Sequence, residues 1–247
     1  MSGHSHWATI KHKKAATDKK RGKAFNRVSK LILIAARNGG SDPDTNLSLR
    51  YAIDKAREVN MPVDTIKRLA RRGAGEEPGQ QIEELLLEGF APGGGAVLVE
   101  AVTDNRNRTV PEVRKIFESH GGKLAGPNAV AWTFKRAGVV TVAAADADGE
   151  KLLELALEAG AEDLAEIDGA WRLTAPPEAF LAVKDAVAAA GIAIASDELA
   201  FLPENEIEIA GADAAKSLAL LSALDDHDDV QNVSVNFQIP DEVAASG

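Results

Sequence analysis

Hydrophobic positions in the first third of the chain recur every three or four residues, which is the spacing of an amphipathic helix. Between residues 17 and 38 this apolar stripe consists of Phe25, Val28, Leu31, Ile32 and Ala35. The run Asn38-Gly39-Gly40 follows, and glycine commonly ends a helix. The pattern therefore predicts a helix from Thr17 to Asn38.

Two shorter helices are predicted next. The first follows Asp44-Thr45-Asn46, a run that offers N-cap side chains, and should turn Leu47, Tyr51 and Ala52 toward the core. The second follows Met61-Pro62 and should end at Arg71-Arg72-Gly73. Three helices make one small domain, which we assign to residues 1–78, with a flexible N-terminal tail. The Gly, Glu and Pro residues from 73 to 80 predict a linker after it.

Beyond residue 80 the apolar residues change to the pattern of strands. We expect strands at 82–88, 96–102 and around 130–134, with a helix from about 108 to 119. The segment 138–202 then reads as strand, helix, a two-strand hairpin turning at Asp168-Gly169, helix and strand. The boundaries expected for these elements are 138–143, 149–159, 163–174, 177–190 and 192–201. This βαββαβ order is that of the ferredoxin-like unit.

Three further elements follow, a strand at 206–209, a helix at 212–224 and a strand at 230–237. They are too few for a separate domain, so we predict that residues 204–247 join residues 79–135 in a middle α+β domain. Residues 136–203 would then be inserted into it. The predicted fold class is α+β, a three-helix N-terminal domain followed by two α/β sandwich domains, the last ferredoxin-like and inserted into the middle one.

The composition limits the kinds of functional site that the chain can form. The chain has 45% hydrophobic residues, only 4% aromatic residues and no cysteine. The absence of cysteine excludes disulfides, thiolate zinc sites and thiol catalysis. The longest apolar run near the basic N-terminus, Leu31 to Ala36, is too short for a signal peptide or a membrane span. We therefore expect a cytoplasmic protein with no membrane partner.

The sign of the charge changes along the chain. Residues 1–75 contain 17 Lys and Arg against 6 Asp and Glu, whereas residues 76–247 contain 11 against 32. The overall net charge of −10 hides this division. A basic block of this density repels itself unless a polyanion neutralises it, which indicates nucleic acid as the partner.

The N-terminal tail holds the densest set of candidate nucleic-acid-binding residues. They are His4, His6, Trp7, Lys11, His12, Lys13, Lys14, Lys19, Lys20, Arg21 and Lys23. The lysines and arginine can contact phosphate, and the indole of Trp7 can stack on an exposed base, a contact worth about 1–3 kcal/mol. The alternative is a solvated tail in which Trp7 packs against the helices.

Two further groups of cations are candidates. Arg68, Arg71 and Arg72 belong to the third predicted helix, which also carries Lys67. Arg106 and Arg108 follow the capping residues Asp104-Asn105 at the start of a predicted helix, where backbone N–H groups favour anions. These two arginines either contact phosphate or form ion pairs with glutamates of the acidic domain, and the sequence leaves both open.

Other motifs give weaker indications of function. The run from Ala91 to Gly95 lacks the Gly-Lys-Ser/Thr of a phosphate loop, so we interpret it as a turn between strands, with close approach of RNA as the alternative. The acidic run from Asp225 to Asp229 is interpreted as a solvated helix-to-strand loop rather than a metal site. Ser2-Gly3-His4 could bind copper or nickel through a free amine, but the same histidine also suits contact with nucleic acid. No hydrolase elbow or HExxH motif occurs, so we expect no catalytic, cofactor-binding or metal-binding residues.

Many of these residues resemble the motifs of the YebC/PmpR family, from one end of the chain to the other. The matching segments, in order, are Gly3-His4-Ser5-x-Trp7-Ala8, x-His12-x-Lys14-Ala15-Ala16, Asp18-x-Lys20-Arg21-Gly22-Lys23, Gly39-Gly40-x-Asp42-Pro43, Leu49-Arg50, Asp54-Lys55-Ala56, Asn60-Met61, Glu88-Gly89-Phe90-x-Pro92-Gly93-Gly94, Thr103-Asp104-Asn105-Arg106-Asn107-Arg108-Thr109, Gly121-Gly122 and Ala156-Leu157-Glu158-Ala159-Gly160-Ala161-Glu162-Asp163. The resemblance implies a three-domain cytoplasmic protein without catalysis. The family includes DNA-binding transcriptional regulators, ribosome-associated translation factors that relieve stalls at proline runs, and mitochondrial activators of cytochrome c oxidase translation.

Two binding functions therefore compete. In the first, the basic tail and helices bind ribosomal or transfer RNA near the peptidyl transferase centre. In the second, the helical domain binds promoter DNA, which would require base-reading side chains on a helix in the major groove. The third predicted helix offers charge with little base-reading chemistry, and Trp7 among histidines and lysines suits folded RNA. We favour the ribosome over DNA, and we expect no small-molecule substrate.

Overall fold

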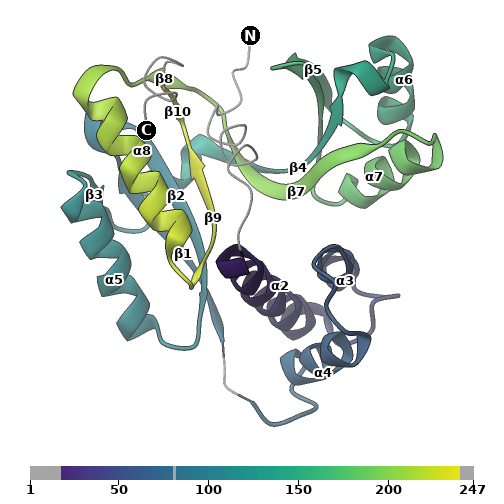
Figure 1. The fold of residues 1–247 in the computed structure, drawn as a ribbon, viewed down its shortest axis with the longest axis horizontal. Helices are drawn as coiled ribbons and strands as arrows, with labels where there is room; N and C mark the ends of the chain where they lie inside the picture. Colours follow the sequence, from purple (N-terminus) through teal and green to yellow (C-terminus); the bar gives the residue numbers. More distant parts are fainter. Residues whose placement is uncertain (1–17, 80–81, 240–247) are drawn as a thin grey trace. The chain divides into compact units, whose positions relative to one another are not determined.

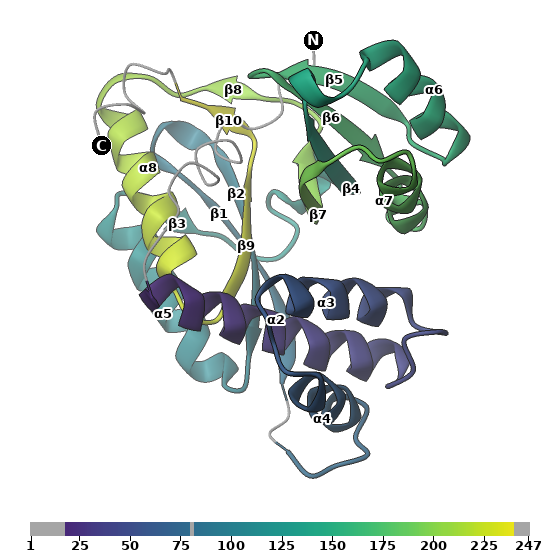
Figure 2. The same cartoon turned by 45° about the vertical axis from the view of Figure 1, so that its right-hand side comes forward.

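The computed structural model describes residues 18–79 and 82–239 (Figures 1 and 2). The contacts among these residues define two compact units. Trp132–Glu206 form one unit, and the other described residues form the second. The contacts do not divide the helical bundle from the middle sheet, which belong to the same unit. The predicted division into three domains with the boundaries given above therefore stays a prediction. No helix in the described ranges is long and apolar enough to cross a membrane.

The three predicted helices of the bundle are confirmed. They are α2 (Asp18–Gly39), α3 (Leu47–Glu58) and α4 (Val63–Gly73). The stripe predicted on α2 packs with α3 and α4 around Ile32, Leu49 and Ile66, which are at most 5% exposed. A large apolar core of this kind supplies most of the stability of short helices.

Asn46 fixes the corner between α2 and α3. Its side-chain oxygen accepts a hydrogen bond from the backbone N–H of Leu49 (3.0 Å), which caps α3. Its amide nitrogen donates to the carbonyl oxygens of Ala35 (2.8 Å) and Gly40 (2.9 Å) at the end of α2. The prediction that Leu47 points toward the core is wrong, since its side chain is 51% exposed. As the first residue of α3, Leu47 lies on the face opposite the bundle core that Leu49 and Ala52 line.

The middle part of the chain forms a four-stranded antiparallel sheet with the order β3-β1-β2-β9. Its elements are β1 (Glu83–Phe90), η1 (Pro92–Gly94), β2 (Ala96–Thr103), α5 (Arg106–Ser119), β3 (Lys123–Leu124), α8 (Gly211–Asp226) and β9 (Val230–Val235). Helices α5 and α8 cover one face of the sheet, and the core between them contains Val97, Phe117 and Leu224 (Figure 1). The segment after residue 206 thus completes the sheet that β1 and β2 begin. The short strands β8 (Ile207–Glu208) and β10 (Phe237–Gln238) pair in parallel beside it.

The second unit has the ferredoxin-like topology that its sequence predicts. Its elements are β4 (Phe134–Ala143), η3 (Ala144–Asp146), α6 (Gly149–Glu158), β5 (Asp163–Ile167), β6 (Ala170–Ala175), α7 (Phe180–Ala189) and β7 (Ile194–Pro203). The antiparallel strand order is β5-β6-β4-β7, the first strand lying between the third and the fourth. The hairpin turns at Asp168 (φ 51°) and Gly169 (φ 75°), both in the left-handed region that a two-residue turn of this kind requires.

The strand predicted around Val130 to Phe134 is wrong. The chain forms a short 3-10 turn, η2 (Ala131–Thr133), and a strand begins only at Phe134. Val130 is buried in this loop and Trp132 is 73% exposed, and the segment is a loop rather than a strand because Glu88 binds the backbone there. Its carboxylate accepts hydrogen bonds from the N–H groups of Asn128 (2.6 Å), Val130 (2.7 Å) and Ala131 (2.8 Å).

Glu88 is 5% exposed, so its charge is stabilised by the loop rather than by water. Burial raises the pKa of the Glu88 carboxyl, but the hydrogen bonds from the backbone of residues 128–131 outweigh burial and hold the pKa below its ordinary value. A lowered pKa in the folded state means that ionised Glu88 stabilises the fold above the unfolded-state pKa. This stabilisation is lost as the pH falls through the folded-state pKa.

We expect Glu88→Gln to lower the free energy of unfolding by about 1–3 kcal/mol at pH 7, because an amide replaces an acceptor that receives three hydrogen bonds. The difference from the wild type should shrink as the pH falls below 4. Urea unfolding at a series of pH values measures both effects. Glu84→Gln, an exposed residue of the same strand, is the matched control, and equal stability of the two variants at pH 7 would contradict this role.

Candidate nucleic-acid interface

The structure describes part of the predicted binding residues. His4, His6, Trp7, Lys11, His12, Lys13 and Lys14 lie outside the described residues. Lys19, Lys20 and Arg21 belong to the first turn of α2, but their side chains also lie outside the description. Lys23 is the first cation of the predicted set whose contacts are defined.

Lys23 and Arg27 lie four residues apart on α2, so they project from one side of the helix. The Lys23 ammonium forms an ion pair with Asp226 at 2.9 Å. The Arg27 guanidinium donates to the carbonyl oxygen of Asp225 (2.6 Å) and to its carboxylate (3.0 Å). This side of α2 therefore faces residues 225–229, the end of α8 and the turn before β9, which we call the acidic loop, and its positive charge is matched within the protein.

Lys30, one turn further along α2, reaches the only residue of that acidic loop that is buried. Its ammonium lies 2.6 Å from Asp229, which is 5% exposed. The second carboxylate oxygen of Asp229 accepts hydrogen bonds from Arg108 (2.7 Å) and the hydroxyl of Thr109 (2.6 Å), both on α5. The Thr103 hydroxyl donates to the same oxygen at 3.2 Å. One carboxylate thus joins α2, α5, β2 and the start of β9.

Burial raises the pKa of Asp229, but the hydrogen bonds from Lys30, Thr109 and Arg108 outweigh it and hold the pKa far below its usual range. The carboxylate also raises the pKa of Arg108. The prediction that residues 225–229 form a solvated loop is therefore wrong for Asp229. Its partners are more than 100 residues away in the sequence, and no local pattern indicates them.

The acidic loop has one histidine, and it too has protein partners. The Nδ1 atom of His227 accepts a hydrogen bond from the backbone N–H of Asp229 (3.1 Å), and its Nε2 atom lies 3.1 Å from Glu112 on α5. Among the described residues, no group of three or more His, Asp or Glu side chains is placed to hold a metal ion.

The two arginines at the start of α5 differ in their surroundings. Arg108 contacts Asp229 and also Asp104 (3.1 Å), which matches the ion-pair alternative for this residue. The side chain of Arg106 is 63% exposed, and its nearest carboxylate, that of Glu83, lies 3.9 Å away. A charge this exposed and this loosely paired gains little from the pair, so Arg106 is available to an external anion.

The cations of α4 also differ. Lys67 and Arg68 are exposed and form no ion pair within the described residues. Arg71 forms an ion pair with Glu77 at 2.9 Å, and 55% of its side chain is exposed. Arg72 is half-buried, and its Nε atom is buried without a hydrogen-bond partner among the residues that the structure describes.

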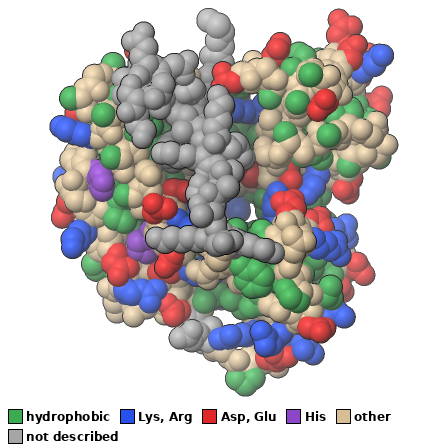
Figure 3. Space-filling view, in the orientation of Figure 1, with side chains coloured by type: hydrophobic (Ala, Val, Ile, Leu, Met, Phe, Trp, Pro, Cys, Tyr) green, Lys and Arg blue, Asp and Glu red, His purple; other side chains and the backbone are tan. Residues whose placement is uncertain are grey.

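A groove with a volume of about 880 Å³ runs beside these α4 cations. Apolar side chains, among them Ile53, Val63 and Ile66, line it together with Lys67 and Arg68. Its lining also contains the acids Asp42, Asp64 and Glu76. Figure 3 shows Lys and Arg side chains gathered over α4 at the lower edge of the view. The bundle thus exposes Lys67, Arg68 and Arg71 on α4, and it also exposes Arg37 on α2 and Arg50 and Arg57 on α3.

Sequence reasoning missed that Arg27 and Lys30 act as internal counter-ions. The signal that could have indicated it is the match between two patterns. Lys23, Arg27 and Lys30 stand on one side of a helix, and a short loop elsewhere carries four acids within five residues. Such a match suggests contact, but it does not show which of the acids becomes buried.

Together, the fold and the charge distribution define an α+β protein with a basic helical bundle attached to an acidic sheet region, and with exposed cations on α4 and at the start of α5. Two family models cover nearly all of it. The model of the TACO1/YebC protein N-terminal domain matches residues 5–76, and that of the TACO1/YebC second and third domain matches residues 82–237. The chain belongs to the TACO1/YebC family.

Similar proteins extend over the full length. A protein of Rubrobacter xylanophilus is 49% identical, covering 99% of this chain and 98% of its own, and one of Dictyoglomus turgidum is 47% identical, covering 100% and 99%. Both are named "Probable transcriptional regulatory protein". The crystal structure of a conserved hypothetical protein from Aquifex aeolicus has 44% identity and a TM-score of 0.85, covering 96% of this chain and 98% of that one.

We expect Asp229→Asn to destabilise the protein by about 3 kcal/mol or more at pH 7, because Lys30 and Arg108 would then surround a neutral group. Since the folded-state pKa of Asp229 is lowered, its stabilisation is fully present above the unfolded-state pKa and is lost only at strongly acidic pH. Urea unfolding with the neighbouring exposed residue as control, Asp228→Asn, measures this effect. Equal midpoints for the two variants would contradict it.

Proposed function

We propose that this protein is a non-enzymatic, nucleic-acid-binding regulator of gene expression that acts on the ribosome. In this proposal, the basic tail and bundle bind ribosomal or transfer RNA near the peptidyl transferase centre and relieve stalling at proline-rich stretches. The regulatory class is supported by the names of the relatives, and the ribosomal target by the resemblance of the chain's motifs to those of ribosome-associated members of the family.

The observation that carries the proposal is the incomplete neutralisation of the N-terminal charge. The acidic loop binds Lys23, Arg27 and Lys30 on one side of α2. On α4, Lys67 and Arg68 keep their charge exposed. A charged surface of this kind attracts a polyanion over several ångströms, and release of counterions from the phosphates drives the binding.

A second candidate is a DNA-binding transcriptional regulator, which the names of the relatives favour. A helix that reads DNA places side chains able to hydrogen-bond base edges in the major groove. The exposed face of α4 presents Lys67, Arg68 and Arg71, and the helix contains no Asn or Gln. Arginine can read guanine, but this set mainly offers contacts to phosphate, which do not specify sequence.

Co-sedimentation with ribosomes and binding to duplex DNA, each measured over a salt series, separate the two candidates. The full chain and a variant lacking residues 1–23 should be compared. We expect ribosome binding that weakens steeply with salt and with the deletion, and weak, sequence-independent binding to DNA. Tight, sequence-selective DNA binding that survives the deletion, without ribosome association, would overturn the ribosomal proposal.

The exposed arginine of α5 provides a single-residue test. We expect Arg106→Glu to weaken RNA binding by about tenfold at low salt without lowering the midpoint of thermal unfolding. The slope of the logarithm of the binding constant against the logarithm of the salt concentration should fall by about one, the loss of one phosphate contact. Lys151→Glu makes the same charge change at an exposed position of α6 and should leave binding unchanged. Equal affinity of the two variants would assign Arg106 to its pair with Glu83.

A further inference from the structure

An aromatic side chain is exposed where β1 ends. Phe90 is 38% exposed, although aromatic residues are scarce in this chain. In the ladder it lies directly opposite Lys123 of β3. Side chains directly opposite in an antiparallel pair point to the same face of the sheet, with their Cβ atoms about 5 Å apart. Lys123 is exposed and has no ion-pair partner in the described part of the chain.

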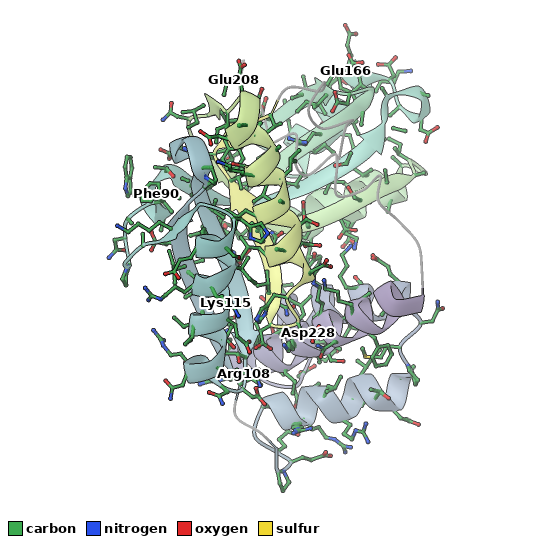
Figure 4. All side chains as sticks on the ribbon, turned by 60° about the vertical axis from the view of Figure 1, so that its left-hand side comes forward. Phe90, Arg108, Lys115, Glu166, Glu208 and Asp228 are labelled. Atoms are coloured by element: carbon green, nitrogen blue, oxygen red, sulfur yellow. The ribbon has the colours of Figure 1, made fainter. Side chains whose placement is uncertain are left out.

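The neighbouring residues show which face this is. Leu124 and Gly89 point toward the helices: Leu124 belongs to the core, and a Cβ atom on Gly89 would lie 2.5 Å from the ring of Phe117 on α5. Because side chains alternate along a strand, Phe90 and Lys123 point to the face that the helices leave uncovered. Figure 4 shows the Phe90 side chain directed away from the sheet.

Two glycine turns lie beside Phe90. In η1, Gly93 and Gly94 have φ angles of 82° and 86°, and a Cβ atom on Gly94 would meet nothing within 4 Å. A Cβ atom on Gly121, the residue before Gly122-Lys123, would lie 3.7 Å from Pro92 and 3.9 Å from Lys216 of α8. These turns therefore expose backbone without side chains, which lets another polymer approach closely.

Lys216 is left out of this surface, because α8 covers the opposite face of the sheet. We use the term Phe90 surface for Phe90, Lys123 and the turns at 92–94 and 121–122.

We propose that the Phe90 surface binds a single-stranded segment of RNA, with one base stacked on Phe90 and a neighbouring phosphate against Lys123. The chemistry that supports this is one exposed ring beside a cation and bare backbone, which is how proteins hold unpaired nucleotides without reading their sequence. A protein partner would call for a continuous apolar patch, whereas Phe90 lies here beside a lysine and glycines. This inference rests on the proposed RNA-binding function and adds a second contact remote in sequence from the basic tail.

The test measures binding of the full-length protein to a fluorescent single-stranded RNA, a 12-nucleotide oligo(U), and to ribosomes. We expect Phe90→Ala to weaken oligo(U) binding by about tenfold, as removal of one stacked base requires, and Phe90→Trp to retain it. Leu86→Ala is the matched control, since Leu86 lies on the same strand and face and is 45% exposed but cannot stack. Lys123→Gln should weaken binding and reduce its salt dependence.

The outcomes distinguish this inference from the function on which it rests. If the wild type binds neither ribosomes nor oligo(U), the proposed function fails. If the wild type binds oligo(U) and Phe90→Ala binds it as tightly as Leu86→Ala does, the Phe90 surface is overturned while the proposed function stands. Loss of ribosome association by Phe90→Ala with unchanged oligo(U) binding would also overturn it, because it would indicate a protein contact. Circular dichroism of each variant confirms that the fold is intact.

Discussion

The carboxylate of Asp229 is the interaction on which the larger unit depends. It receives Lys30 from α2 together with Arg108 and Thr109 from α5, so it holds the helical bundle to the middle sheet. A buried ion pair gains little net stability over an apolar contact, because both charges lose water. It is nevertheless demanding in geometry, since any other arrangement of α2 would leave Asp229 buried without Lys30. The contact therefore specifies one docking of the bundle.

This docking decides which positive charges remain for a partner. The large excess of Lys and Arg in residues 1–75 suggests a uniformly available basic surface. The contacts show otherwise, since Lys23 and Arg27 neutralise the acidic loop while Arg68 stays exposed. At physiological salt, charges act over about 8 Å, so local exposure matters more than the total. A nucleic-acid partner would therefore meet α4 and the start of α5 rather than this side of α2.

Local signals were enough to predict most of the elements. Helix α4 follows its Met61-Pro62 start, and the hairpin turns at Asp168-Gly169, because proline and the positive-φ residues constrain the backbone within a few positions. The predictions that failed concern residues whose partners are distant in the sequence. The expected strand near Val130 is a loop, since Glu88 captures its N–H groups from 42 residues away. In the same way, the burial of Asp229 follows from α2 and α5, which no property of the acidic run itself reveals.

Strand β1 carries both a buried residue that binds a loop and an exposed aromatic residue. Glu88 and Phe90 are two residues apart and point to the same face, but Glu88 is buried under the loop that it binds, whereas Phe90 is open to solvent. Phe90 is also paired with Ala96 on one side and with Lys123 on the other. Its backbone is therefore fixed by two ladders before any ligand arrives. A ring held in this way loses little conformational entropy on stacking, so more of the contact energy appears as affinity than it would for an aromatic residue on a free loop.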